Sequence, residues 1–287
     1  MDTDASPGAL GAGLLRGKTA WITGGGSGLG RAMALRFAQL GATLALSGRR
    51  EDPLAETARA IEQAGGAASC APCDVRDPAA VESAFETICA THGHVDILVN
   101  NAAGNFLCPS EDLSPNAFSA VVDIVLKGTF LCTRIAGRHW IESRRGGNIL
   151  NIATTYAATG SSFVLPSACA KAGVVAMTRS LAVEWARHRI RLNAIAPGPI
   201  PTDEAFARLL PTEELARSRQ RRIPAGRFGT AQELAELAAF LVSDAADWMR
   251  GEVVTFDGGE WLYGAGEFNE LLELPAELLE ELARRRR

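Results

Sequence analysis

The chain has 287 residues, of which 47% are hydrophobic, so it can bury a sizeable core as one large domain or two small ones. Its formal net charge of -4 excludes a general attraction to nucleic acid or to anionic membranes. Because no apolar run is long enough to span a bilayer, we expect neither membrane insertion nor a nucleic-acid partner.

The opening residues, "MDTDASPGALGAGLL", carry acids where a secretory or mitochondrial presequence would carry basic side chains. They predict a flexible tail over residues 1–15 and a cytoplasmic protein. The six cysteines are scattered through apolar segments of a chain too large to depend on disulfides, so we expect reduced, buried thiols. "CAPC" has no second cysteine pair, and its alternating surroundings predict a strand rather than a metal site.

Apolar strand patterns alternate with helical patterns along most of the chain, which is typical of a parallel sheet wrapped by helices. No Pro/Gly-rich linker divides the chain, so the sequence predicts a single doubly wound α/β domain over residues 16–265. We expect strands at residues 19–23, 43–48, 68–75, 96–102, 148–154, 191–197 and 252–259. Helices are expected to begin near Gly28, Pro53, Pro78, Pro115, Ser167 and Ala231.

Two segments interrupt this alternation. Residues 199–227 are polar and arginine-rich and follow a strand end, where ligands bind in such sheets, so they predict a small lid after the sixth strand. Residues 266–287 predict a helical tail that contains an amphipathic helix ending in four arginines. Basic residues there suit the helix dipole and are more often solvated than engaged in binding.

The first strand leads directly into the glycine-rich loop "TGGGSGLG" and then into a helix. Gly24, Gly28 and Gly30 allow a sharp turn and a close approach to a pyrophosphate, whose charge the free amides of a helix N-terminus can meet. Such a loop can also be a bare turn, but the strand before it and the helix after it favour dinucleotide binding.

The end of the second strand, "SGRRE", indicates which dinucleotide binds. A carboxylate there would accept hydrogen bonds from a free ribose diol, whereas Arg49 and Arg50 suit a 2′-phosphate. We therefore expect NADPH, although one or both arginines could simply begin a solvated helix. Asp74, after the third strand, is placed to reach the adenine.

Together, "TGGGSGLG", "CDVRD", "NNAAG", the helix around Lys171 and "PGPI" resemble the short-chain dehydrogenase/reductase family over about residues 16–262. The resemblance implies a Rossmann-like single domain, a nicotinamide cofactor and a homotetramer. It implies that Lys171 contacts the nicotinamide ribose. The full set of implied cofactor contacts is Gly24, Ser27, Gly28, Leu29, Gly30, Arg49, Arg50, Asp74, Val75, Asn101, Ala102, Gly104, Lys171, Pro197, Gly198 and Ile200.

One position departs from the family's usual pattern. In its carbonyl reductases a tyrosine lies four residues before the lysine, on the same helical face, and protonates the alkoxide. Ser167 occupies that position here, and its alkyl hydroxyl is far less acidic. Either the chain is a non-catalytic NADP(H)-binding protein, or its reaction protonates no carbonyl oxygen at that place.

From "NNAAGNFLCPSEDLSPNAF" through "NIATTYAATGSSFVLPSACAKAG" to "FDGGEWLYGAGEFNEL", the chain resembles the 2,4-dienoyl-CoA reductases, especially the mitochondrial type. This resemblance implies that Tyr156 and Asn105 hold the thioester carbonyl, that Lys171 orients NADPH and that Ser167 assists. The implied substrate contacts are Arg76, Phe106, Ser114 and Arg208.

The chemistry suits these residue types. Hydride added at C5 of a 2,4-dienoyl-CoA drives negative charge onto the thioester oxygen, which a phenol and a carboxamide can stabilise. Protonation at C2 then yields a 3-enoyl-CoA, as in β-oxidation of unsaturated chains. One alternative remains open for the reaction: a reductase of 3-oxoacyl or other carbonyl or enoyl substrates. Separately, Tyr156 could be a packing aromatic and Asn105 a turn residue.

Two further features leave alternatives open. Lys127 stands where the family usually carries asparagine, and it could replace that donor, point away, or lie near Lys171 and lower its pKa. The arginines of residues 199–227 could bind coenzyme A phosphates or form a solvated face paired with Glu213 and Glu214. They are Arg208, Arg217, Arg219, Arg221 and Arg222.

Overall fold

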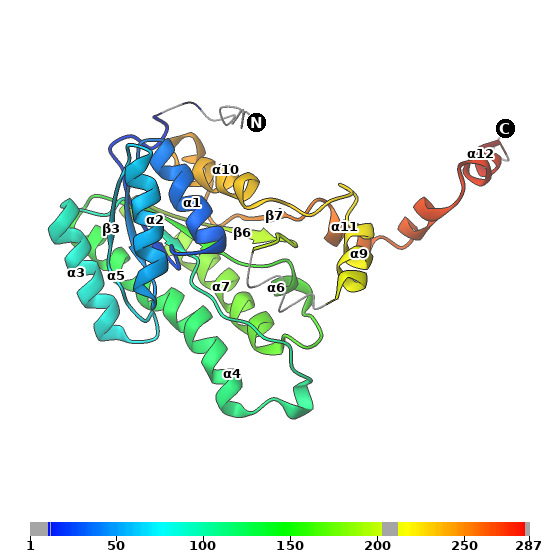
Figure 1. Cartoon of the computed structure of the whole chain (residues 1–287), viewed down its shortest axis with the longest axis horizontal. Helices are drawn as coiled ribbons and strands as arrows, with labels where there is room; N and C mark the ends of the chain where they lie inside the picture. Colours follow the sequence, from blue (N-terminus) through cyan, green and yellow to red (C-terminus); the bar gives the residue numbers. More distant parts are fainter. Residues whose placement is uncertain (1–10, 12, 203–211, 285–287) are drawn as a thin grey trace.

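The computed structural model describes residues 11, 13–202 and 212–284. Within them, seven parallel strands form one sheet in the order β3-β2-β1-β4-β5-β6-β7 (Figure 1). The order reverses between β1 and β4, so the fold is the predicted doubly wound, Rossmann-like sheet. The strands are β1 (Thr19–Thr23), β2 (Thr43–Ser47), β3 (Ala67–Cys70), β4 (Ile97–Asn100), β5 (Gly147–Ile152), β6 (Ile190–Pro197) and β7 (Val253–Phe256).

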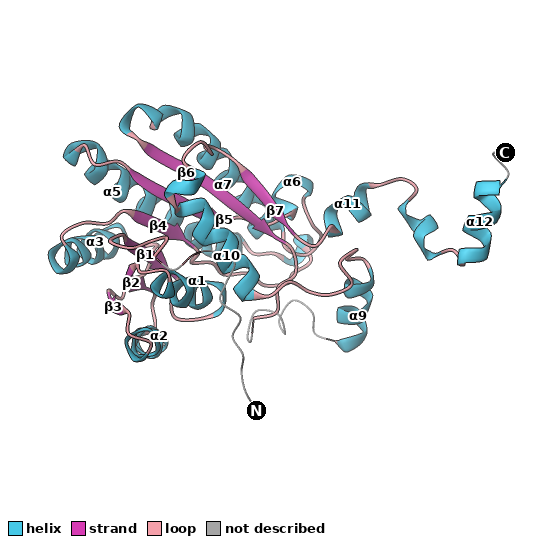
Figure 2. Ribbon diagram, turned by 90° about the horizontal axis from the view of Figure 1, so that it is seen from above, coloured by secondary structure: helices cyan, strands magenta, loops and turns pink. Residues whose placement is uncertain are grey.

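Helices cover both faces of the sheet (Figure 2). One face packs on α1 (Gly28–Gln39), α2 (Glu51–Gln63) and α10 (Ala231–Val242), and the other on α3 (Pro78–His92), α5 (Gly128–Ser143) and α7 (Leu165–Glu184). Side chains alternate between these layers: Ile22 joins the first core cluster, and its neighbour Trp21 joins the second. Both faces are apolar because both are buried, which explains the continuous hydrophobic runs.

The third strand ends earlier than expected. It stops at Cys70, two residues before Pro72, and not at residue 75. The amides of Ala71 and Cys73 on either side still donate to Leu46 O and Gly48 O, at 2.9 and 3.1 Å. Two helices also begin two residues before their expected starts, α2 at Glu51 and α7 at Leu165.

The expectation of six buried thiols is wrong for most of them. Cys73 and Cys132 are buried, Cys89 and Cys108 are partly exposed, and Cys70 and Cys169 are exposed. Cys70 lies on the edge strand β3, and Cys169 lies on the outer face of α7, so neither faces the core. All six thiols are free.

A long helical segment runs from Pro115 to Ser143 with one wide turn inside it. It consists of α4 (Pro115–Val122), the π-helical turn η2 (Asp123–Lys127) and α5. Ser114 caps α4 by accepting a hydrogen bond from the amide of Ala117 at 3.2 Å. Single π turns inside α-helices often mark functional sites, and this one ends at Lys127.

The short elements complete the chain. They are η1 (Ser110–Asp112), α6 (Tyr156–Thr159), η3 (Ala186–His188), α9 (Glu213–Arg221), η4 (Asp244–Ala246), α11 (Glu260–Ala265), η5 (Asn269–Glu273) and α12 (Ala276–Arg284). None of the described helices is long and apolar enough to cross a membrane.

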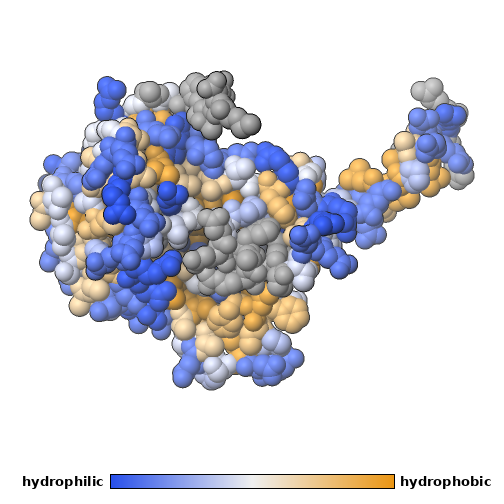
Figure 3. Space-filling model, viewed as in Figure 1, coloured by the Kyte–Doolittle hydropathy of each residue, from blue (hydrophilic) through white to orange (hydrophobic). Residues whose placement is uncertain are grey.

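The packed domain begins earlier than predicted, and a helical arm leaves it at the C-terminal end. Leu15, which the sequence assigned to the tail, is fully buried and its amide donates to Leu40 O at 3.0 Å, so the packed domain begins before residue 16. The predicted C-terminal helix is α12, and the segment from Gly266 to Arg284 projects from the body as an arm (Figures 1 and 3). Leucines along this arm remain exposed, including Leu272 at 70%.

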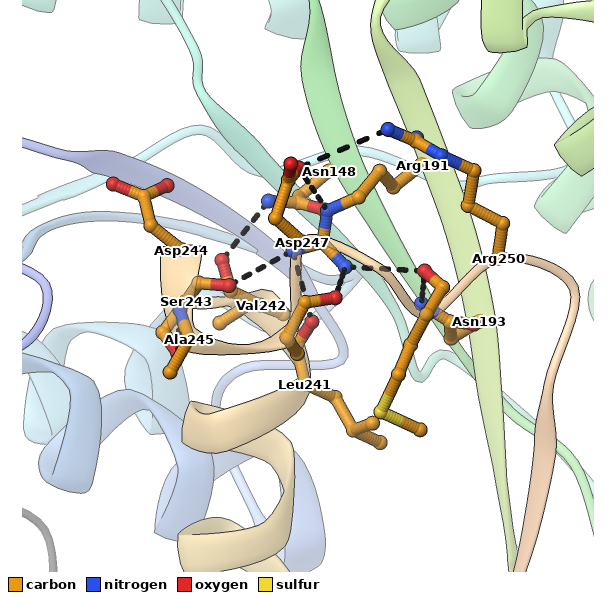
Figure 4. A network of polar contacts seen from close by, with 12 residues as sticks. Asn148, Arg191, Asn193, Leu241, Val242, Ser243, Asp244, Ala245, Asp247 and Arg250 are labelled. Atoms are coloured by element: carbon orange, nitrogen blue, oxygen red, sulfur yellow. Dashed lines mark hydrogen bonds and ion pairs between the residues drawn. The ribbon is translucent and has the colours of Figure 1, made fainter.

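A buried arginine fastens the end of the sheet opposite to the strands' carboxyl ends (Figure 4). Arg191, at the start of β6, donates to the carbonyl oxygens of Ser243 and Ala246, both at 2.9 Å, and of Leu241 at 3.2 Å. Leu241 lies in the last turn of α10 and Ser243 is its C-cap, so the guanidinium pairs carbonyl oxygens at the helix C-terminus, where intrahelical donors run out. Burial lowers the pKa of Arg191.

Candidate active site

A cavity of about 320 Å³ lies at the carboxyl ends of β1, β2 and β4, where the strand order reverses and such sheets bind ligands. The predicted cofactor residues that line it are Gly24, Ser27, Gly28, Leu29, Arg49, Arg50, Asp74, Val75, Asn101 and Ala102. The cavity is also lined by residues that were not among the predicted cofactor contacts: Gly26, Gly48, Pro53, Leu54, Cys73, Ala103, Ile124 and Thr202.

The glycine-rich loop is built for close backbone approach. Gly24 has φ +68°, and its amide donates to Ser47 O at 2.7 Å, which ties the loop to β2. A side chain at Gly30 would collide with the carbonyl oxygen of Gly24, so only glycine lets α1 start this near to β1. The first turn of α1 therefore faces the cavity with its amide donors.

Asn101 fixes this loop from the neighbouring strand end. Its side-chain amide donates to Thr23 O at 3.0 Å and to Gly24 O at 3.2 Å. The hydroxyl of Thr23 in turn accepts from the amides of Asn101 and Ala102, at 3.0 and 3.1 Å. Asn101 thus holds the shape of the glycine-rich loop as well as lining the cavity.

Positive charge gathers at the far end of the cavity, between β2 and α2. Arg49 and Arg50 are exposed there and line the cavity. Arg76 engages the carboxylate of Asp74 through its Nε at 3.0 Å from both oxygens, and this pairing, with Arg49 nearby, holds the pKa of Asp74 below its usual range. Within the described residues, Arg76 lies outside the cavity lining and orients Asp74.

Three of the four predicted catalytic side chains form one hydrogen-bonded cluster. The Tyr156 hydroxyl lies 3.1 Å from Ser167 Oγ, and Asn105 Nδ2 donates to it at 3.4 Å. Tyr156 follows β5 as the first residue of α6, Asn105 follows β4, and Ser167 is buried in the first turn of α7. Neighbouring carboxyl ends of the sheet therefore bring these side chains together.

Lys171, the fourth, lies one helical turn after Ser167 on α7 and is buried, with 6% of its surface exposed. Its ammonium donates to the carbonyl oxygen of Ile152, at the end of β5. Burial lowers the pKa of Lys171 to about 8. The shift arises from desolvation, not from a second lysine.

Lys127 lies on the surface. Its side chain is 52% exposed and its ammonium is 3.9 Å from the carboxylate of Asp123, one turn earlier in the π-helical segment. Of the three roles left open by the sequence, this position favours the one in which Lys127 points away from Lys171.

Several predicted residues lie beside the described cavity without lining it. Pro197, Gly198 and Ile200 form the end of β6 and the following loop, where the Gly198 amide donates to Phe256 O at 3.0 Å. Gly104 lies near Ile124, and Phe106 packs against α4 and α7. Arg208 lies outside the described residues, and α9 is the described part of the predicted lid.

The described arginines of the lid are partly engaged in ion pairs. Arg217 pairs with Glu213 at 2.6 Å, one turn earlier on α9, as the solvated-face alternative holds. Arg219 pairs with Glu260 at the start of α11, at 2.9 Å. These pairs favour a structural role for both side chains.

Two threonines that the sequence analysis did not single out belong to this region. Thr202 lies close to Gly28 of the glycine-rich loop, where an added Cβ atom would be 3.5 Å from the threonine side chain. The Thr154 hydroxyl, two residues before Tyr156, is buried without a hydrogen-bond partner among the described residues. Thr154 lies in the segment after β5 and Thr202 in the segment after β6, and this position beyond a strand's carboxyl end is the signal that could have identified them.

Comparison with known proteins gives one family and consistent relatives. Residues 24–260 match the family model described as enoyl-(acyl carrier protein) reductase. A Bacillus subtilis protein named as a probable 2,4-dienoyl-CoA reductase, (2E)-enoyl-CoA-producing, is 46% identical over 85% of this chain and 97% of its own. A Caenorhabditis elegans protein named as a probable 2,4-dienoyl-CoA reductase, (3E)-enoyl-CoA-producing, is 45% identical over 88% of this chain and 84% of its own.

Solved structures agree with the fold. A Bacillus anthracis short-chain dehydrogenase superposes with a TM-score of 0.78 at 45% identity, covering 85% of this chain and 96% of that one. A Beutenbergia cavernae protein, described as an NAD(P)-dependent gluconate 5-dehydrogenase with NADP bound at low occupancy, superposes with a TM-score of 0.83. It is 36% identical and covers 88% of this chain and 100% of that one.

Proposed function

The chain belongs to the short-chain dehydrogenase/reductase family of oxidoreductases, and from that premise we propose that it is an NADPH-dependent 2,4-dienoyl-CoA reductase. The observation that carries this proposal is the cluster of Tyr156, Asn105 and Ser167 beside the buried Lys171. It provides two neighbouring donors for one oxygen atom.

These donors suit a thioester oxygen that gains negative charge. Tyr156 can donate its hydroxyl proton and Asn105 an amide proton, and each such donor contributes roughly 3 kcal/mol of transition-state stabilisation. Ser167 lies 3.1 Å from the Tyr156 hydroxyl and holds it in place. When bound, NADPH would supply the hydride, and we assign to the Lys171 ammonium the role of holding its nicotinamide ribose.

The proposed cofactor follows from charge at the cavity's far end. Arg49 and Arg50 line it, and guanidinium groups recognise phosphate better than a ribose diol. Gly24 and Gly28 line the cavity at the N-terminus of α1, where the backbone can approach a pyrophosphate closely. We expect NADPH to bind at least about tenfold more tightly than NADH, which titration of both cofactors measures.

The finer points of the proposal follow the family. Protonation of the dienolate at C2 gives a 3-enoyl-CoA in the proposed reaction. We further propose that the protein is a cytoplasmic homotetramer and that it acts in the oxidation of unsaturated fatty acids. The named relatives divide on the product, so protonation at C4, giving a 2-enoyl-CoA, is the competing outcome. Product analysis by mass spectrometry and NMR distinguishes them.

A parallel assay tests the activity. NADPH absorbance is followed with a 2,4-dienoyl-CoA, a 3-oxoacyl-CoA and a 2-enoyl-CoA, and we expect oxidation with the first alone. Turnover of the 3-oxoacyl-CoA alone would identify a carbonyl reductase. Tight NADPH binding without turnover of any substrate would instead identify a cofactor-binding protein.

Replacing Tyr156 tests the shifted tyrosine itself. Tyr156→Phe removes one oxyanion donor, so we expect kcat on the dienoyl-CoA to fall about 100-fold while the Kd of NADPH changes less than about twofold. The chain's other tyrosine provides the control, because Tyr263 lies on α11 and its hydroxyl pairs with Glu273. Full activity of Tyr156→Phe would refute the assigned role.

A further inference from the structure

Three large apolar side chains are exposed beside the candidate active site, one on the loop after β4 and two at the junction of the preceding loop with α7. They are Leu107 at 45%, Phe163 at 55% and Leu165 at 41% exposure. Leu107 follows Asn105 in the loop after β4, and Phe163 and Leu165 precede Ser167 at the start of α7. Figure 3 shows apolar surface on this face, spreading over the loop that leads from β4 to α4.

Phe163 has an uncommon backbone conformation. Among the described residues, the non-glycine residues with positive φ are Arg144, Arg189 and Phe163, at 56°, 58° and 66°. The two arginines end α5 and η3, where a left-handed residue is a common stop. Phe163 ends no helix, and a bulky residue there costs free energy that the surroundings must supply.

A backbone hydrogen bond holds this conformation and joins the two loops. The amide of Cys108 donates to the carbonyl oxygen of Phe163 at 2.9 Å. The strained residue therefore keeps its ring on the surface, where burial cannot stabilise it. An exposed, strained aromatic side chain is better explained by a ligand than by folding.

The same loops carry the catalytic cluster. Cys108 is three residues from Asn105, a stretch that spans at most about 11 Å, and Phe163 is four residues before Ser167. Asn105 and Ser167 both contact Tyr156. A molecule whose carbonyl oxygen reaches Tyr156 thus has its adjoining carbons within reach of the apolar surface.

The charges nearby indicate which end of an acyl-CoA this surface contacts. Glu111 and Asp112 follow closely in η1 and are exposed, so the phosphates of coenzyme A would be repelled. An uncharged hydrocarbon chain meets no such penalty and gains from apolar contact.

We propose that Leu107, Phe163 and Leu165 form the binding surface for the part of the acyl chain beyond the reacting double bonds, and that the Phe163 ring makes the enzyme favour longer chains. This proposal deepens the proposed function and rests on it for the identity of the substrate. The hydrogen bond to Cys108 positions the ring, and the ring supplies the contact.

Binding of unreactive saturated thioesters tests it without turnover. Isothermal titration calorimetry with butanoyl-CoA and dodecanoyl-CoA, in the presence of NADP⁺, gives the ratio of their two Kd values. Each fully buried CH₂ contributes about fourfold in affinity, so even a partly exposed surface should make dodecanoyl-CoA at least about tenfold tighter for the wild type.

Two substitutions separate the ring from the strained backbone. Phe163→Ala removes the ring and keeps the strain, whereas Phe163→Gly removes both and should fold at least as well. We expect both to reduce the Kd ratio below about threefold, with butanoyl-CoA affinity changed less than about twofold. Trp248→Ala, at a large aromatic side chain that is 97% exposed two residues after η4, should leave the ratio unchanged.

The outcomes separate this proposal from the proposed function. A ratio that survives both Phe163 substitutions, or wild-type protein that binds neither thioester, overturns the acyl surface. If the ratio depends on Phe163 while no 2,4-dienoyl-CoA is reduced, the acyl surface stands and the proposed reaction is wrong. If dienoyl-CoA is reduced with no chain-length dependence, the reaction stands and the acyl surface is wrong.

Discussion

The buried ammonium of Lys171 is a cost to folding that the candidate site requires. Burial lowers the pKa of Lys171 from 10.5 to about 8, so at neutral pH the charged form is held in the fold against its own hydration. Its hydrogen bond to Ile152 O offsets part of this cost. Lys171 therefore lowers the stability of the folded chain, while its proposed role is in cofactor binding.

Replacing Lys171 should therefore raise the stability of the fold and abolish activity. We expect Lys171→Met to raise the free energy of unfolding at neutral pH by roughly 1 to 3 kcal/mol, while NADPH-dependent turnover is lost. Chemical denaturation measures the first effect and the NADPH assay the second. Lys127→Met, at an exposed lysine paired with Asp123, is the control and should change stability by less than about 0.5 kcal/mol.

The contribution of Lys171 to folding stability should depend on pH with a definite sign. Between pH 8 and 10.5 the unfolded chain binds more protons at Lys171 than the folded chain, so this residue's contribution to stability rises with pH across that window. The Lys171→Met variant lacks this rise. Equal slopes for the wild type and the variant would contradict the assigned pKa.

Single residues also mark what the sequence could predict. The shift of the tyrosine from position 167 to Tyr156 is visible in the sequence, and the cluster with Asn105 and Ser167 follows from it. The orientation of Lys127 is not visible, because it depends on a π-helical turn for which no proline or glycine inside the segment gives a signal. Likewise, the pairing of Asp74 with Arg76 competes with the role that its position after a strand predicted.

At the scale of elements, the junction of β1 and α1 leaves no space for a side chain at Gly30. A Cβ atom at Gly30 would overlap the Gly24 carbonyl, and backbone atoms cannot move aside as a flexible side chain can. We expect Gly30→Ala to displace the start of α1, to weaken NADPH binding more than about tenfold and to destabilise the fold by roughly 1 to 3 kcal/mol.

A nearby glycine supplies the control for this substitution. A Cβ atom at Gly104 would meet only Ile124 Cδ1, at 3.4 Å, which is an ordinary contact. Gly104→Ala should therefore be nearly neutral in thermal unfolding. Equal losses in both variants would mean that the close approach at Gly30 is not the cause.

Element boundaries followed the sequence where capping signals are strong. Pro78 and Pro115 begin α3 and α4 as expected, because Asp77 and Ser114 cap them. The start of α7 was misplaced by two residues, since Pro166 is accommodated in the first turn of the helix and does not precede it. The end of β3 was misplaced because the alternation of apolar residues continues past Pro72.

At the scale of the whole molecule, the parallel sheet was predictable because its central strands β1, β2, β4, β5 and β6 are largely buried and therefore mostly apolar. The position of the C-terminal helix was not predictable. An amphipathic pattern predicts that α12 is a helix, but it does not say which surface, if any, its leucines cover.

Removal of the arm tests its independence from the core. Hydrogen bonds from Asn269 fasten the arm to the carbonyl oxygens of Leu262 and Tyr263, next to it in the chain, and its leucines remain exposed. We expect a chain ending at Ala265 to keep the Tm of the full chain within about 2 °C. A larger decrease, followed by calorimetry and size-exclusion chromatography, would show that the arm packs on a subunit in solution.

The scarcity of tyrosine gives this protein an unusual spectroscopic property. The chain has two tyrosines, and their hydroxyl groups differ in every contact: Tyr156 meets Ser167 and Asn105, while Tyr263 meets Glu273. Desolvation, together with the hydrogen bond to Glu273, raises the pKa of Tyr263. Biosynthetic labelling with fluorotyrosine would thus yield two fluorine resonances, one inside the candidate site and one outside it. The first would report each bound thioester directly, with the second as an internal reference.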